Sequence, residues 1–201
     1  METNNTQPKG YPIEYAYAKG KLVYFRYLTE QDAISNWHLW FNSQEVTRNL
    51  VEQYWVNTPE DQINYLKMLR ESRDRLTLAI VEIETNKHIG VGGLGTIRQF
   101  HKNAEVSVII GEKKYRDGRY VFESLALLLE IGFTRLNLHK ITASALIDNV
   151  QSQELNKLLG LKKAACLKEH YFSNGYYKDV VVYEVLRKDW LKSKRRPQPA
   201  Y

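Results

Sequence analysis

Basic side chains gather where a predicted strand gives way to a predicted helix, an arrangement that could bind an anion. The strand spans Ala104–Ile110, the break Gly111–Asp117 and the helix about Arg119–Leu136. The first N–H groups of a helix lack partners within the helix and carry partial positive charge, which favours a bound phosphate. Because any strand–helix junction has such groups, solvated charges are the alternative interpretation. The basic residues are Lys113, Lys114, Arg116 and Arg119.

The elements around this junction predict a mixed α/β sheet rather than a regular parallel one. Thr29, with Asp32 three residues later, and Thr58, followed by Pro59, mark two helix starts. Asn174-Gly175 is a hairpin signal. The predicted strands are Leu22–Tyr27, Leu76–Glu82, His88–Leu94, Ala104–Ile110, Lys140–Leu146, about Ala165–Phe172 and about Lys178–Arg187, and the other predicted helices are Thr58–Glu71 and Val150–Leu159, which Gly160 caps.

Several segments in order resemble one enzyme family. The run IIGEKKYRDGRYVFES resembles the coenzyme A-binding motif Q/R-x-x-G-x-G/A of the GNAT acetyltransferases. RYLTEQDAISNWHLWFNSQEV, LNLHKITASALIDNVQSQELNKLLGL and HYFSNGYYKDVVVYEVLRKDW are similar to the opening, later and closing segments of the branch that contains ribosomal-protein N-terminal and amino-sugar acetyltransferases. The resemblance covers about residues 21–190, with an N-terminal extension (1–20) before it and a basic disordered tail (191–201) after it.

The match departs from the family pattern at its phosphate loop. Arg116 fits the first motif position, but Arg119 and Val121 stand where glycines or alanine are expected, and Gly118 lies one residue early. Small residues there allow the backbone to approach a pyrophosphate closely. In the later helix, whose pattern is N-x-x-S/A-x-x-L-Y-E-K-L-G-F, Asn156 takes the place of the tyrosine, and Leu158 and Leu161 also differ.

The resemblance implies a twisted, mostly antiparallel GNAT-like α/β sheet with splayed central strands, flanked by about four helices. It implies direct transfer of an acetyl group from acetyl-CoA to an amine, with no metal. The residues it assigns to acetyl-CoA binding are Ile109, Ile110, Arg116, Asp117, Gly118, Arg119, Tyr120, Val121, Asn149 and Ser152.

Two side chains match catalytic positions of the family. Glu105 occupies the position of the glutamate that removes the amine proton in the histone acetyltransferase branch. The alternatives are a strand glutamate that faces solvent or one that pairs with Lys102 or another lysine. Ser152 matches the serine near the thiol sulfur, and Asn149 the asparagine that orients the pantetheine arm. A serine in the first helical turn and an N-cap asparagine are the equally plain structural interpretations.

Other candidates have weaker support. His170 could face the acceptor pocket, whereas His139 is interpreted as structural, and the single cysteine, Cys166, lacks the partners of a nucleophile. Four aromatic side chains could wall the acceptor site, although packing is their commoner role. They are Trp37, Trp40, Tyr54 and Trp55.

Composition limits the remaining function classes. Four of the six excess positive charges lie in the tail, so the body is too weakly basic to indicate nucleic-acid binding. The sequence predicts a cytoplasmic protein without a signal peptide or membrane span. Its expected partner is a small-molecule or peptide amine, with a nucleotide-linked amino sugar favoured and a homodimer left open. The alternative function is a catalytically impaired acyl-CoA-binding or regulatory protein on the same fold.

Overall fold

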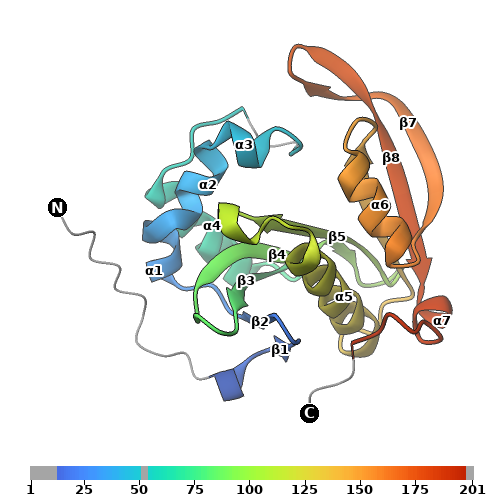
Figure 1. Cartoon of the computed structure of the whole chain (residues 1–201), viewed down its shortest axis with the longest axis horizontal. Helices are drawn as coiled ribbons and strands as arrows, with labels where there is room; N and C mark the ends of the chain where they lie inside the picture. The colour runs from blue at the N-terminus through green and yellow to red at the C-terminus, as the bar shows by residue number, and fades with distance from the viewer. Residues whose placement is uncertain (1–12, 51–53, 198–201) are drawn as a thin grey trace.

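The computed structural model describes residues 13–50 and 54–197, and within these ranges one eight-stranded sheet runs through the molecule (Figure 1). Its strand order is β1-β2-β3-β4-β5-β6-β8-β7, and every neighbouring pair is antiparallel except β5 and β6. This confirms the predicted fold class. The strands are β1 (Ala18–Lys19), β2 (Val23–Arg26), β3 (Leu76–Glu82), β4 (His88–Arg98), β5 (Asn103–Ile110), β6 (Lys140–Leu146), β7 (Lys162–Ser173) and β8 (Tyr176–Leu186).

Helices cover both faces of the sheet. Along β3, Leu78 and Ile80 belong to the core under α5 (Arg119–Thr134), whereas Ala79 and Val81 belong to the core under the first helices, as the two-residue period of a strand requires. No helix within residues 13–50 and 54–197 has the length and apolarity to cross a membrane. The remaining helical segments are η1 (Ile13–Tyr15), α1 (Glu30–Asp32), η2 (Ala33–Trp37), α2 (His38–Asn42), α3 (Gln44–Thr47), α4 (Pro59–Glu71), η3 (Lys113–Tyr115), α6 (Val150–Leu158) and α7 (Arg187–Trp190).

Both predicted helix starts are capping boxes. Thr58 accepts a hydrogen bond from the Asp61 N–H and the Asp61 carboxylate accepts one from the Thr58 N–H; Thr29 and Asp32 repeat the arrangement. The helix after Thr29 is nevertheless broken by a π-helical turn at η2. Ser35 has non-helical backbone angles, and its hydroxyl donates to the Asp32 carbonyl, a bond that competes with the helix ladder.

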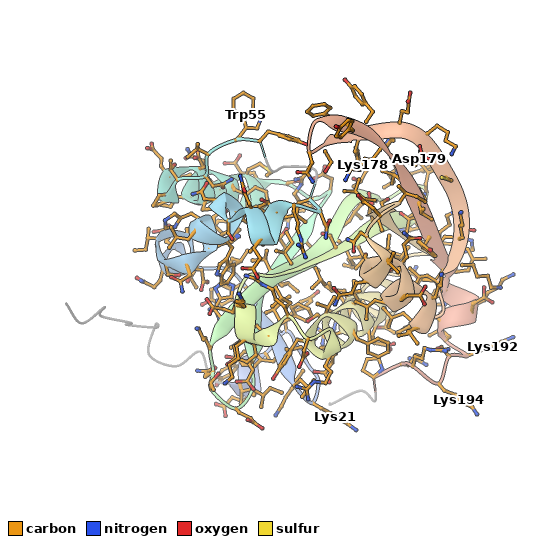
Figure 2. All side chains as sticks on the ribbon, turned by 45° about the horizontal axis from the view of Figure 1, so that its top comes forward. Lys21, Trp55, Lys178, Asp179, Lys192 and Lys194 are labelled. Atoms are coloured by element: carbon orange, nitrogen blue, oxygen red, sulfur yellow. The ribbon has the colours of Figure 1, made fainter. Side chains whose placement is uncertain are left out.

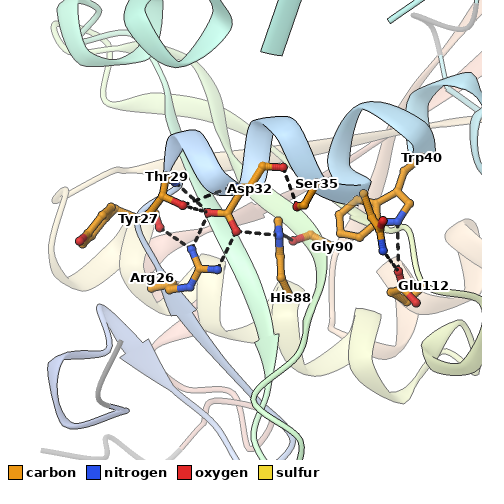
Figure 3. A network of polar contacts seen from close by, with 10 residues as sticks. Arg26, Tyr27, Thr29, Asp32, Ser35, Trp40, His88, Gly90 and Glu112 are labelled. Carbon is orange, nitrogen blue, oxygen red and sulfur yellow. Dashed lines mark hydrogen bonds and ion pairs between the residues drawn. The ribbon is translucent and has the colours of Figure 1, made fainter. Parts of the chain in front are cut away.

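Asp32 is also the centre of a buried polar network between the first helices and the sheet (Figure 3). Its carboxylate accepts two hydrogen bonds from Arg26, at 2.7 and 2.8 Å, and lies 3.1 Å from His88 Nδ1. All three side chains are less than a tenth exposed. Burial alone would raise the pKa of Asp32, but the hydrogen bonds and charges of Arg26 and His88 hold that pKa well below its ordinary value.

The network positions the segment that follows β5. The His88 ring packs edge-on against Trp40, whose indole N–H donates to Glu112 (Figure 3). Lys87 pairs with the same carboxylate at 2.6 Å. Trp40 also covers Gly111, where an added Cβ would lie 1.9 Å from the indole. The turn between β5 and η3 is therefore packed against the first helices, and Gly111 is required there by close contact.

Helix α5 is fastened to the sheet by one carboxylate. Glu123 accepts hydrogen bonds from the backbone N–H groups of Lys21, Leu22 and Val23, at 2.8, 2.7 and 2.9 Å. These donors belong to the turn into β2, about a hundred residues earlier in the chain. Because the contact joins distant segments, no local pattern predicts it.

We expect Glu123→Ala to lower the free energy of unfolding by about 2 kcal/mol, since hydrogen bonds to a charged group contribute about 1.5–3 kcal/mol. Urea unfolding of both proteins measures the change. Glu154→Ala, on the exposed side of α6, is the matched control and should unfold like the wild type. Equal stability of Glu123→Ala and the wild type would contradict this anchoring role.

The C-terminal segment differs from the prediction of a disordered tail that begins at residue 191. The Arg196 guanidinium pairs with Glu130 of α5 through bonds of 2.6 and 3.0 Å, and the Trp190 indole donates to the same carboxylate. Arg196 is thus held on α5, a contact between distant residues that composition does not indicate. Lys192 and Lys194 project from the body (Figure 2). Residues 1–12 and 198–201, also part of the predicted extension and tail, lie outside the described residues.

Candidate active site

A cleft opens where the two parallel central strands separate. β5 and β6 pair only from Asn103–Lys140 to Glu105–Thr142, and beyond that point their backbones diverge. The opening has a volume of about 360 Å³. It is lined by β5 from Glu105 to Ile110, β6 from Ala143 to Leu146, α5 through Val121 and Leu125, the start of α6, and residues near the end of α3. The predicted splay of the central strands is therefore present.

The Glu105 carboxylate lies in this cleft at the point where the strands part. Glu105 is half-buried, and among the described residues its carboxylate forms no hydrogen bond or ion pair. The lysine-paired alternative is thus not what the structure contains. Burial and then the charge of Glu105 raise the pKa of the Tyr171 phenol, which lines the same cleft. The cleft therefore holds a carboxylate able to accept a proton near a phenol that stays protonated.

Tyr171 lines the cleft and lies at the end of a bulge in β7. Leu167 pairs with Val180 and Tyr171 pairs with Lys178, so four steps on β7 oppose two on β8. Within the bulge, Glu169 has a φ of 45° and its N–H donates to Asp179. Bulges commonly re-aim side chains beside active sites. His170, the sequence candidate, is exposed and does not line the cleft, whereas its neighbour Tyr171, which was not predicted, does.

Helix α6 supplies the opposite wall. Asn149 is its N-cap and accepts a hydrogen bond of 3.2 Å from the Ser152 N–H, so the structural interpretation of Asn149 is correct. Both side chains also line the cleft. One turn further, Asn156 is 2% exposed and lines it too. In Figure 1, α6 lies beside the long β7–β8 hairpin, across the opening from α3.

The loop before α5 divides its charged side chains between several partners. Arg116 donates from Nε to the Ile110 carbonyl at 3.2 Å and from Nη2 to the Gly111 carbonyl, and its Nη1 lies 3.1 Å from Glu45 Oε1 without hydrogen-bond geometry. The Arg116 guanidinium therefore holds the end of β5 through its hydrogen bonds to these two carbonyls. Of the residues from Arg116 to Val121 that were assigned to cofactor binding, Arg116 and Val121 line the cleft.

Arg119 and Asp117 form an exposed pair at the start of α5. The Asp117 carboxylate accepts from the Arg119 N–H at 3.0 Å and from its guanidinium at 2.8 Å. The Arg119 bond lowers the pKa of Asp117. Gly118, with a φ of 87°, adopts the left-handed conformation that favours glycine. The Asp117 carboxylate thus accepts from the first N–H of α5, and Arg119 does not line the cleft.

Comparison with known proteins identifies the family. The model of the acetyltransferase (GNAT) domain matches residues 23–162. The chain belongs to the GNAT acetyltransferase family. It is 27% identical over 164 residues to the uncharacterized N-acetyltransferase YoaA of Bacillus subtilis, and the aligned region covers 81% of this chain and 92% of YoaA. It is 28% identical over 149 residues to the spermidine N(1)-acetyltransferase of Vibrio cholerae, covering 72% and 84% of the two chains.

Solved GNAT structures share the fold. The crystal structure of the Vibrio cholerae spermidine N-acetyltransferase in complex with CoA and spermine superposes with a TM-score of 0.79 at 22% identity, over 85% of this chain and 99% of that one. The enzyme class predicted from the sequence, an acetyltransferase, is confirmed by the family. The narrower branch of ribosomal-protein and amino-sugar enzymes stays a prediction, since these relatives are spermidine or uncharacterized N-acetyltransferases.

The four aromatic side chains that could have walled the acceptor site do not line the cleft. Trp37 and Trp40 are buried in the core between those helices and the sheet, which is the packing role left open above. Trp55 is 83% exposed and points away from the body (Figure 2). Tyr54 donates to the Phe172 carbonyl and so connects the segment before α4 to the β7–β8 hairpin.

Within residues 13–50 and 54–197, no group of three or more His, Cys, Asp and Glu side chains could hold a metal ion.

Proposed function

We propose that the protein is an acetyl-CoA-dependent N-acetyltransferase in which Glu105 takes the proton from a primary amine during direct transfer. The observation that supports this most is the unpaired Glu105 carboxylate in the cleft between β5 and β6. A general base must lie within reach of the proton that it removes and must be free to accept it. The position of Glu105 in the cleft, on a central strand and without a partner among the described residues, supports this role.

The residues of the cleft fit an extended acyl carrier. Between Val106 and Ile110, β5 has a sheet neighbour on the β4 side only, so its other edge offers backbone hydrogen bonds to the amides of a pantetheine arm. Helix α6 begins at the cleft, which Asn149, Gln151 and Ser152 line. The positive end of a helix favours a phosphate group. Bound acetyl-CoA supplies the activated acetyl group.

The protein's own groups carry the remaining steps. Glu105 accepts the amine proton while the nitrogen–carbon bond forms and the carbon–sulfur bond breaks. Ser152 and Asn149 line the cleft at the start of α6, which supports a role for both in orienting the thioester. The backbone N–H groups on the edge of β5 that faces the cleft are suited to polarise its carbonyl. No covalent enzyme intermediate is needed.

For the acceptor, we infer a cationic aliphatic amine such as spermidine. Among the described residues that line the cleft, the charged ones are Glu45, Glu105 and Arg116, and the arginine is engaged with backbone carbonyls and Glu45. Because Glu45 is paired with Arg116 and Lys113, Glu105 is the unpaired charge among these cleft residues, and a carboxylate favours a polyamine over an anionic nucleotide-linked sugar. The names of the Vibrio cholerae and Escherichia coli spermidine relatives support the same class.

We expect CoA at about 100 times its Kd to stabilise the protein by about 2.7 kcal/mol, which raises the Tm by about 5–10 °C. Release of free thiol from acetyl-CoA, measured with a panel of amines, then identifies the acceptor. Spermidine should give a kcat/KM at least about tenfold above that of a nucleotide-linked amino sugar or an N-terminal peptide, the discrimination that about 1.4 kcal/mol provides. A higher kcat/KM for the nucleotide-linked amino sugar than for spermidine would contradict the polyamine assignment and support the amino-sugar prediction.

The alternative function, an acyl-CoA-binding or regulatory protein, is favoured by Val121. Its branched side chain lines the cleft where the family pattern has glycine or alanine. Stabilisation by CoA without turnover of any amine would support this alternative. Absence of stabilisation by both CoA and acetyl-CoA would contradict both functions.

A further inference from the structure

The buried ring of His88 has an oxygen atom opposite each of its two nitrogens. Nδ1 lies 3.1 Å from an oxygen of the Asp32 carboxylate, and Nε2 lies 2.8 Å from the Gly90 carbonyl oxygen (Figure 3). A backbone carbonyl has no proton to donate, and Arg26 keeps Asp32 ionised through two hydrogen bonds. Both ring nitrogens therefore face groups that can only accept a hydrogen bond.

This arrangement decides the charge of the ring. A neutral imidazole carries a single N–H, so its other nitrogen would turn a lone pair toward an oxygen. The His88 side chain is 8% exposed, so water is not available to relieve that repulsion. The imidazolium form donates on both sides and satisfies both oxygens. The charged residues around the ring, among those that the structure describes, are Asp32 on α1, Arg26 on β2 and, next to Trp40, Glu112 and Lys87.

The ring bridges the three residues that begin β4. His88 supplies the donor and Gly90 the carbonyl, so Ile89 is held between them. The Ile89 carbonyl accepts hydrogen bonds from the Gly111 and Glu112 N–H groups, at 2.9 and 3.2 Å. These two residues follow β5 directly. The His88 ring thus fixes the backbone group to which the turn after β5 is bonded.

The same stretch of β4 lies against the part of β5 that lines the cleft. Gly90 pairs with Ile110, and a Cβ added to Gly90 would lie 2.2 Å from the Ile109 carbonyl oxygen. Ile109 and Ile110 both line the cleft. Because the two backbones are in such close contact, a shift at Gly90 also moves the end of β5.

We propose that His88 is a positioning residue, which as an imidazolium holds the end of β5 in the geometry that binds the pantetheine arm of acetyl-CoA. This inference rests on the proposed acetyl-CoA function. Loss of a ring proton to solvent turns one of the two contacts into a repulsion between a lone pair and an oxygen. The end of β5 then leaves the binding geometry in part of the molecules, and the apparent affinity for acetyl-CoA falls accordingly. The contribution of His88 is therefore present at low pH and lost as the pH rises past its deprotonation.

The protonation of His88 is measured directly in the wild type. Long-range proton–nitrogen NMR of isotope-labelled histidine rings distinguishes two protonated nitrogens from one, and the chain has five histidines to assign. At about pH 7.5, where a histidine in free solution is largely neutral, His88 should show two protonated nitrogens. A His88 ring with a single protonated nitrogen at this pH would overturn the inference.

Calorimetric binding of acetyl-CoA, which has no free thiol to titrate, measures the consequence. At about pH 7, His88→Gln should bind acetyl-CoA about tenfold more weakly than the wild type, because an uncharged amide cannot hold both oxygens. As the pH rises, the wild type should fall to the affinity of the variant over the range in which NMR shows His88 losing its proton. The variant itself should show no such fall.

His101→Gln is the matched control, since His101 is exposed in the turn at the other end of β4. It should bind acetyl-CoA like the wild type at every pH. Both wild-type measurements decide the inference even if His88→Gln fails to fold.

The possible failures are distinct. Equal affinity of His88→Gln and the wild type, or a wild-type affinity that does not follow the proton on His88, would overturn the positioning role and leave the acetyl-CoA function intact. A wild type that binds neither acetyl-CoA nor CoA at any pH would overturn the proposed function and the role of His88 in binding.

Discussion

Replacing Glu105 with glutamine is expected to lower kcat by about 10²- to 10⁴-fold at neutral pH, with little change in the affinity for acetyl-CoA. A positioned general base contributes a factor of this size, and glutamine keeps the shape of the side chain but cannot accept the proton. The Glu105 carboxylate lies in the cleft and has no hydrogen-bond or ion-pair partner among the described residues, so the substitution breaks no such contact within the fold. Steady-state thiol release and calorimetric binding of CoA measure the two effects.

The sheet offers a matched control for this substitution. Glu184 lies in the same cross-strand row as Glu105, because Thr142 of β6 pairs with both residues. Its carboxylate pairs with Lys140 and does not line the cleft. Glu184→Gln should therefore keep kcat within about twofold of the wild type, as expected for a residue away from the chemistry. If Glu105→Gln kept a kcat within about threefold of the wild type, Glu105 could not be the general base.

The parts of the fold with strong local signals were predictable from the sequence. Thr58 followed by Pro59 and Asp61 correctly predicts the start of α4, and Asn174-Gly175 forms the expected hairpin turn, with φ values of 54° and 88°. Each signal is satisfied by contacts among neighbours in the chain. The break at Ser35 was not predictable, because the side-chain bond that competes with the helix does not alter the apolar period on which the prediction depends.

The site was predictable where the backbone alone places a residue, and less so where side chains choose between partners. Glu105, Asn149 and Ser152 meet in one cleft because a strand and a helix start carry them there. Arg119 was assigned to phosphate binding from its position, but it pairs with Asp117 two residues away. Sequence spacing cannot decide between two partners at similar reach, since that choice depends on rotamers and on competing charges.

The Asp32 network should give the largest change in stability. We expect Asp32→Ala to lower the free energy of unfolding by about 3–5 kcal/mol and the Tm by about 10 °C, because removal of one partner leaves a buried charge without compensation. The charge left behind is that of Arg26, which is 4% exposed. Thermal and urea unfolding measure the loss. Asp61→Ala removes the same capping-box position from the exposed start of α4 and should cost far less.

The pH dependence of unfolding separates the charge of Asp32 from its packing. Its pKa in the folded protein lies well below the unfolded value of about 3.9, so its contribution is fully present above about pH 4 and is lost as the pH falls below that value. The wild type should therefore lose stability between about pH 4 and 2 more steeply than Asp32→Ala. Glu82, Glu112 and Glu130, whose pKa values are also lowered, remain in both proteins and cancel in the difference. Parallel pH profiles would show that Asp32 stabilises the fold through packing alone. A steeper wild-type profile would mean that the charge of Asp32, paired with Arg26, stabilises the folded protein.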